Sequence, residues 1–166
     1  MATPTSLPAS FTAGAVLTAA QMNDLRGAFR VLQVVSASTS TPVTSTVTTY
    51  ADTGLTASIT PQSNTSKILV IATSATPAKT AGDSNNVLNL RLMRGATVLT
   101  SHLDMLRTNS LVINYSSADT IVWLDSPATT SATTYKVQLA NGVAASLVAV
   151  QTANSESSII LMEISA

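Results

Sequence analysis

Few side chains in this sequence have the types and spacing needed for acid–base or metal chemistry. The chain contains one histidine, His102, followed two residues later by a carboxylate at Asp104. A zinc site needs three or four protein ligands, usually from Cys and His. Because there is no cysteine and no second histidine, a metal would depend on oxygen ligands alone. The sequence therefore predicts no metal site, and it favours a surface or interface role for His102.

The eight acidic residues do not form an evident catalytic pair. Glycoside cleavage, for example, uses two carboxylates that flank the scissile bond. Most of the acidic residues lie in turn-forming stretches, and Asp52, which precedes Thr53 and Gly54, is typical of a turn. Glu163 allows two interpretations, an outward-facing strand residue or a buried carboxylate that needs an arginine partner. We favour the outward-facing interpretation.

Motifs for covalent catalysis and for nucleotide binding are missing from the sequence. No G-x-S-x-G pattern marks a serine nucleophile, and neither G-x-x-x-x-G-K-[ST] nor G-x-G-x-x-G occurs. The arginines at 91, 94 and 107 have no interleaved aromatic residues on which bases could stack. The sequence thus predicts no catalytic residues and no cofactor. It favours a binding or structural protein over an enzyme, with a polysaccharide depolymerase as the enzymatic alternative.

Composition excludes several kinds of partner. The 166 residues carry a formal net charge of zero, and only 10% of them are charged. We therefore expect no nucleic-acid partner and no membrane-surface partner. The apolar runs are too short to span a bilayer, and the first residues do not resemble a signal peptide. The lack of cysteine fits synthesis in a reducing cytoplasm.

The low charge also predicts self-association. Mean hydropathy is positive, and serine and threonine supply most of the polar surface in place of lysine and glutamate. Monomeric proteins normally keep a charged surface and avoid large apolar patches. We therefore expect much of this surface to be covered by other copies of the chain.

The first 32 residues predict an extended arm and one short amphipathic helix. Two prolines within residues 1–10 favour an extended arm, and Thr18 with Gln21 forms a capping-box pattern. A helix from about Ala19 to Leu32 would place four apolar residues on one stripe, namely Met22, Leu25, Phe29 and Leu32. This helix could pack on its own sheet, or copies could meet in a short coiled-coil seam. Docking onto the domain or another protein is the interpretation we favour.

Residues 33–166 predict an all-β domain. Nine or ten short strands recur at intervals of about ten residues, which is typical of a jelly-roll-like antiparallel β-sandwich. A central hairpin is expected in residues 50–73. Its first arm alternates from Leu55 to Ile59. Its second arm, Ile68–Ala72, is a continuous apolar run, which suits a strand covered on both faces.

The following segments predict a second hairpin and a recognition loop. Residues 87–94 alternate, with the leucines at 88, 90 and 92 inward and Met93 outward, before a turn at Arg94 and Gly95. Residues 101–109 are expected to form a connection, and Trp123 a core or interface anchor. Residues 75–86 form a long polar loop, and such loops on β scaffolds often carry recognition. The candidate contact residues in it are Lys79, Asp83, Asn85 and Asn86.

Several segments of the chain resemble small β-rich virion proteins of tailed bacteriophages, which include tail-fibre and minor structural proteins. The segments are FTAGAVLTAAQMNDLRGAFRVLQVV, TYADTGLTASITPQSNTSKILVI and NLRLMRGATVL, with similar features in TTYKVQLANG and SSIILMEI. The resemblance covers most of the chain from Phe11 to Ile164. No catalytic residues belong to these segments, which mark strands and turns.

The resemblance implies a non-enzymatic virion protein, made in the host cytoplasm. It implies a fibre-like homotrimer that attaches to another phage structural protein of the tail, baseplate or capsid through its N-terminal segment. The β-sandwich would then project for host attachment, with a host surface glycan as a candidate ligand. The alternative is a capsid decoration or cement protein that stabilises the phage head.

Overall fold

The computed structural model describes residues 31–81, 87–107, 115–143 and 147–165, together with Gly14, Val16 and Ala19. In these ranges the chain consists almost entirely of antiparallel strands, with one short 3-10 helix, η1, at Thr152–Asn154. The twelve strands are β1 (Val31–Thr39), β2 (Val43–Ser45), β3 (Ala51–Ile59), β4 (Lys67–Ser74), β5 (Ala78–Ala81), β6 (Val87–Arg94), β7 (Thr97–Arg107), β8 (Tyr115–Ser116), β9 (Asp119–Asp125), β10 (Thr133–Asn141), β11 (Leu147–Val150) and β12 (Ser157–Ile164).

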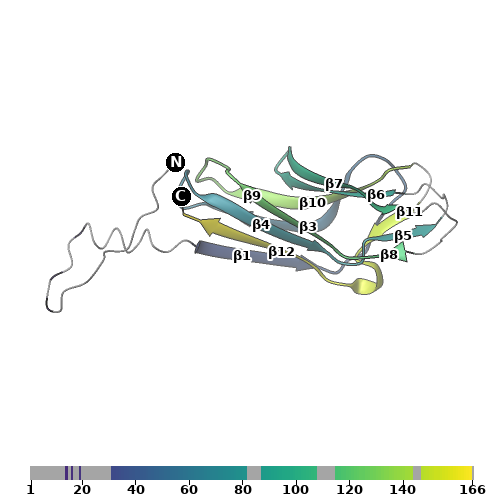
Figure 1. Cartoon of the computed structure of the whole chain (residues 1–166), viewed down its shortest axis with the longest axis horizontal. Helices are drawn as coiled ribbons and strands as arrows, with labels where there is room; N and C mark the ends of the chain where they lie inside the picture. The colour runs from purple at the N-terminus through teal and green to yellow at the C-terminus, as the bar shows by residue number, and fades with distance from the viewer. Residues whose placement is uncertain are drawn as a thin grey trace.

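The eight longer strands form two stacked sheets of four. Sheet A has the order β1-β12-β4-β9, and sheet C has the order β3-β10-β6-β7. The two sheets run along the long axis of an elongated body (Figure 1). Except for the β6–β7 hairpin, every step from one long strand to the next crosses from one sheet to the other. The all-β, antiparallel prediction is therefore confirmed.

Alternation of side chains builds the core between the two sheets. In β4 and β12 every second residue is buried, so Ile68, Val70 and Ala72 of β4 face inward with Ile159 and Leu161 of β12. Ile121 of β9 also faces inward from sheet A. Sheet C contributes large inward residues, which are Leu55, Ile59, Leu88, Leu90, Leu92, Leu106, Tyr135, Val137 and Leu139. Residues 135, 137 and 139 alternate along β10 and share one face, and all three are fully buried.

Four short strands form a third sheet, B, at one end of the sandwich (Figure 1). Its order is β2-β11-β5-β8. Each strand belongs to a different connection between the long strands: β2 lies between β1 and β3, β5 between β4 and β6, β8 between β7 and β9, and β11 between β10 and β12. The connections at this end are therefore tied to one another by backbone hydrogen bonds.

The predicted central hairpin in residues 50–73 is wrong. Its two arms are strands β3 and β4, but β3 pairs with β10 and β4 pairs with β12 and β9. The physical reason is that the patterns of both arms predict strands but not their partners, and the turn residues between them suit a crossing between sheets as well as a hairpin. The turn residues between them carry the chain from sheet C to sheet A.

Other sequence predictions also need correction. Leu32, expected in a helix, lies in strand β1, which begins at Val31. The segment predicted as a connection after residue 100 continues strand β7 to Arg107, with a positive φ at Asp104 and register shifts against β6. Met93 was expected to face outward but is buried beside one of these register shifts. The β6–β7 hairpin itself, closed by Arg94 opposite Thr97, is confirmed.

Candidate interaction surface

The carboxylate of Asp125 joins the two sheets. At the end of β9 it accepts a 2.7 Å hydrogen bond from the Tyr135 hydroxyl of β10. The Arg94 guanidinium of β6 donates to both of its oxygens at 2.8 Å. Tyr135 is fully buried, and burial together with the adjacent carboxylate raises its pKa. Asp125 therefore has a structural role, because its hydrogen bonds connect the end of β9 in sheet A to β6 and β10 in sheet C.

Glu163 is a second buried carboxylate, and the outward-facing interpretation of this residue is wrong. Its side chain is fully buried in β12 and accepts hydrogen bonds from Gln33 Nε2 at 2.6 Å and from the Gln62 backbone N–H at 2.8 Å. The Ser63 backbone N–H lies at 3.4 Å. Burial would raise the pKa of Glu163, but these hydrogen bonds outweigh burial and lower it. Glu163 thus fixes the turn between β3 and β4 to sheet A.

The outer face of sheet C carries a network of charged and amide groups. Asp52 accepts hydrogen bonds from Lys136 Nζ at 2.9 Å and from Gln138 Nε2 at 2.6 Å. Burial would raise the pKa of Asp52, but these two donors lower it. Arg91 Nε donates to Gln138 Oε1 at 2.8 Å, and its guanidinium lies 3.9 Å from the centre of the Tyr50 ring. This face is suited to contact with water.

His102 pairs with Asp119, not with Asp104. Its Nδ1 lies 3.0 Å from the Asp119 carboxylate, which connects the edge strand β7 of sheet C to the edge strand β9 of sheet A. In the described part of the chain, no three His, Asp or Glu side chains form a group that could hold a metal ion. The histidine therefore serves as a link between the two sheet edges.

The outer face of sheet A is largely apolar, with seven apolar residues and one serine in two adjacent rows. Because paired residues in neighbouring strands point to the same side, the register places Val34, Met162, Leu69 and Leu124 in one row. The adjacent row contains Ser36, Ile160, Ile71 and Val122. We call these eight residues the apolar face. The row that follows on the same face is polar and contains Ser38, Ser158, Thr73 and Thr120.

Strand β9 is the most exposed part of the apolar face. Val122 and Leu124 are 59% and 52% exposed, and Trp123, on the other side of the strand, is 37% exposed. Trp123 is therefore not a core residue. As the edge of sheet A, β9 pairs only with β4, in a register without a bulge. Charged residues and prolines usually protect an edge strand from pairing with another chain. Residues 120–124 contain neither.

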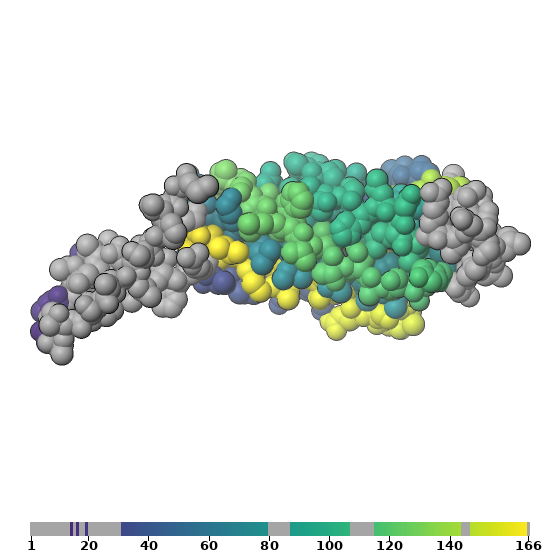
Figure 2. Space-filling model, in the orientation of Figure 1, coloured from purple at the N-terminus to yellow at the C-terminus, as the bar shows by residue number. Residues whose placement is uncertain are grey.

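The two outer faces of the sandwich thus differ in chemistry. The face of sheet C presents Asp52, Arg91 and Lys136, whereas the eight residues of the apolar face include none that are charged. The nearest cation on the same side of sheet A is Lys67 at the end of β4, whose Nζ donates to Ser126 Oγ at 2.9 Å. Figure 2 shows one side of the elongated body that carries these faces. One broad side is therefore suited to solvent and the other to a partner.

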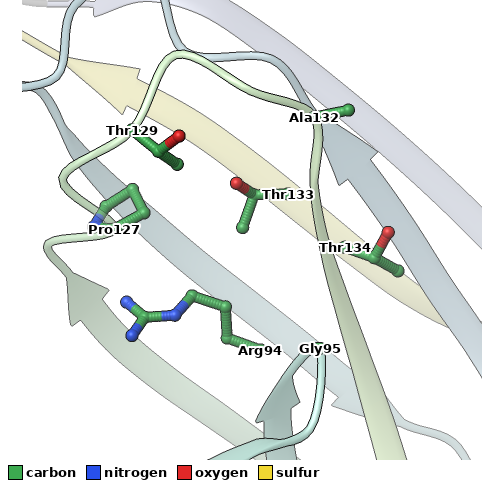
Figure 3. Close-up of a pocket in the computed structure, with 7 residues that line it drawn as sticks. All are labelled: Arg94, Gly95, Pro127, Thr129, Ala132, Thr133 and Thr134. Carbon is green, nitrogen blue, oxygen red and sulfur yellow. The ribbon is translucent and has the colours of Figure 1, made fainter.

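A shallow pocket lies beside the ion pair between Arg94 and Asp125. It has a volume of about 330 Å³ and is lined by Arg94, Gly95, Pro127, Thr129, Ala132, Thr133 and Thr134 (Figure 3). Arg94 is already engaged with Asp125, and the Thr133 hydroxyl donates to the Ser131 carbonyl. These contacts do not indicate a particular ligand.

Of the candidate residues named from the sequence for docking and recognition, two lie in the described part of the chain, Lys79 and Leu32. Lys79, expected in an exposed recognition loop, is buried in strand β5, so that assignment is wrong. Asp83, Asn85 and Asn86 lie outside the described residues, as do Met22, Leu25 and Phe29 of the predicted helix. The remaining helix residue, Leu32, is half-buried in β1.

The apolar face was not predicted from the sequence. The signal for it was present in two continuous apolar runs, Ile68–Ala72 and the segment Ile159–Met162. A strand covered by the core on one side only would alternate, so continuous runs in β4 and β12 indicate a second apolar contact. The sequence does not show that β4 and β12 are neighbours, which is what places the two runs side by side.

Comparisons with known proteins give only distant likenesses. No family model matches the chain, and no curated protein matches it in sequence. Among solved structures, the VP2 subviral particle of infectious bursal disease virus is 11% identical, with a TM-score of 0.45 over 82% of this chain and 38% of VP2. Dimeric latent PorU from Porphyromonas gingivalis is 8% identical, with a TM-score of 0.38 over 82% of this chain and 13% of PorU.

The Gx strain of the same bursal disease virus gives a further likeness, at 13% identity and a TM-score of 0.44 over 80% of this chain and 32% of the viral chain. This chain spans well under half the length of each of these neighbours. At such TM-scores the likenesses carry no inference about function. In the described residues, no helix is long and apolar enough to cross a membrane.

Proposed function

We propose that this chain is a non-enzymatic structural protein of a bacteriophage virion. In this proposal it is a fibre-like homotrimer, anchored to the particle by residues 1–32, whose β-sandwich serves host attachment. The apolar face is the observation that carries the proposal, because a protein with one uncharged, apolar side is suited to permanent contact with other subunits. The resemblance of its sequence segments to tailed-phage virion proteins supports the phage assignment.

The order of the strands supports a jelly-roll type of sandwich. Taken in chain order, the eight long strands alternate between the sheets so that the first and last, β1 and β12, become neighbours. Jelly rolls are built of two four-stranded sheets, and they occur in viral capsid and lectin domains. Because one fold hosts many functions, this support is an analogy at the level of the fold.

The positions of the carboxylates support a role without catalysis. Asp125, Glu163, Asp52 and Asp119 each have a structural partner in the other sheet, a turn or a neighbouring strand. Their hydrogen bonds hold the fold together. A polysaccharide depolymerase would instead need two carboxylates that face a common cleft.

Host attachment, with a surface glycan as ligand, remains the proposed role of the loop that contains Asp83, Asn85 and Asn86. The buried Lys79 is not part of this proposal. The alternative function is a cement protein that stabilises the phage head. The breadth of the apolar face favours this alternative as well, because a flat sheet face is suited to lateral contact within a shell.

Two measurements on phage particles with and without this protein test the proposal. If the protein serves attachment, its loss lowers adsorption to host cells and leaves the heat stability of the head unchanged. If it is a cement protein, its loss lowers the temperature at which heads release DNA and leaves adsorption unchanged. If wild-type particles do not contain this protein, both functions are contradicted.

A further inference from the structure

We propose that the apolar face of sheet A binds a second copy of this chain. The inference deepens the proposed function by naming the partner of this surface. Because two identical faces meet, the contact is twofold and joins two copies, in addition to any threefold contact within the proposed trimer. It rests on the structure of the isolated chain, so it can be tested with purified protein whether or not the chain belongs to a virion.

The first argument comes from coverage of the strands. The continuous apolar runs of β4 and β12 are typical of strands with an apolar contact on both sides. Inward, Ile68, Val70, Ile159 and Leu161 are fully buried in the core. Outward, the alternate residues of both strands stay partly exposed. The described chain therefore covers these strands on one side only.

The second argument is charge. A foreign protein would normally bring charged side chains to the contact, and each would lose its hydration against uncharged aliphatic groups. A second apolar face brings none, because its eight residues carry no charge. The charged groups of sheet C, including Asp52 and Lys136, lie on the opposite side of the sandwich and stay in water. Electrostatics therefore favours another copy as the partner.

The third argument is shape. Two sheets pack face to face about 10 Å apart when their facing side chains are aliphatic and interdigitate. The apolar face offers valine, leucine, isoleucine and methionine, with one serine at 36, in two adjacent rows.

The size of the face sets the expected affinity. The two rows span about four residues of each of the four strands; at about 3.3 Å per residue and about 4.8 Å between strands, they give a flat area on the order of 250 Å². A stable interface of standard size buries about 800 Å² on each partner. The face alone therefore predicts weak association, strengthened wherever other contacts hold the copies together.

The test is sedimentation of the full-length chain at about 1 to 500 µM. The wild type should associate, and Val122→Lys should weaken the association about tenfold or more, because it places an ammonium group in the contact. Val98→Lys is the matched control. Val98 is an exposed valine, 45% accessible, in strand β7 of the other sheet, and its replacement should leave the association unchanged.

A second measurement uses the lack of cysteine in the chain. With a short bifunctional thiol reagent, Val122→Cys should give a covalent dimer and Val98→Cys should not, since a single thiol can only link to another copy. A wild type that stays monomeric at 500 µM would overturn the proposal. So would an association that Val122→Lys leaves intact, because it would then run through other residues, such as 1–30.

Discussion

Replacement of Glu163 by glutamine is expected to destabilise the fold strongly. The carboxylate is fully buried and accepts short hydrogen bonds from Gln33 Nε2 and the Gln62 N–H. A glutamine has one acceptor oxygen, so its NH₂ group would face one of these donors. Hydrogen bonds to a charged group contribute about 1.5–3 kcal/mol each, and a buried donor without a partner costs about 1–3 kcal/mol. We expect a loss of about 3 kcal/mol.

Thermal unfolding at neutral pH measures this loss. For a domain of this size, about 3 kcal/mol lowers Tm by roughly 6–12 °C. Glu156→Gln is the matched control, because Glu156 is exposed and its replacement should change stability by less than about 0.5 kcal/mol. Both variants and the wild type must be compared at one protein concentration, because self-association also raises Tm.

The pH dependence gives an independent check on the same carboxylate. Hydrogen bonds hold the pKa of Glu163 in the folded protein below the ordinary pKa of a glutamate, so they stabilise the fold at pH values above that ordinary pKa. This stabilisation is lost as the pH falls through the folded pKa. The gap in stability between wild type and Glu163→Gln should therefore narrow in acid. A gap that stays constant down to about pH 3, or a Tm of Glu163→Gln equal to that of Glu156→Gln, would refute the reasoning.

Three further substitutions test other contacts by chemical or thermal unfolding. Tyr135→Phe removes the buried hydrogen bond to Asp125 and should cost about 1.5–3 kcal/mol; an unchanged Tm would show that the hydroxyl does not stabilise the fold. Gly142→Ala places a Cβ 2.8 Å from Val87 Cβ and should lower the free energy of unfolding by about 1–3 kcal/mol. An unchanged free energy of unfolding would mean that the turn can shift to make room for the Cβ. Lys136→Ala breaks a partly exposed ion pair and should cost less than about 1 kcal/mol; a larger loss would indicate a tighter network.

Strand existence could be predicted well from this sequence, because it depends on local periodicity. The alternation of residues 134–140 and the β6–β7 turn at Gly95 both correspond to what the structure contains. Partner choice between strands could not be predicted, since it depends on contacts between distant residues. The turn chemistry between β3 and β4 is compatible with a hairpin and with a crossing between sheets, and only the position of β10 and β12 decides between them.

The candidate surface could be predicted only in part. Low charge indicated that the chain has a covered side, but not which side it is. The location depends on the pairing of β4 with β12, which places Leu69 opposite Met162 and Ile71 opposite Ile160. Glu163 could not be placed either, because its partners Gln33 and Gln62 lie about a hundred residues or more away in the chain.

The position of β12 between β1 and β4 has a consequence for biosynthesis. These two strands leave the ribosome long before β12, the last of the twelve strands to be made, can fill the gap between them. During that interval the nascent chain presents two unpaired strand edges and a hydrophobic core that lacks the inward side chains of β12. Pairing between residues so distant in sequence is intrinsically slow. We therefore expect the nascent chain to be most prone to aggregation just before its final strand is translated, and chaperones to act at that stage.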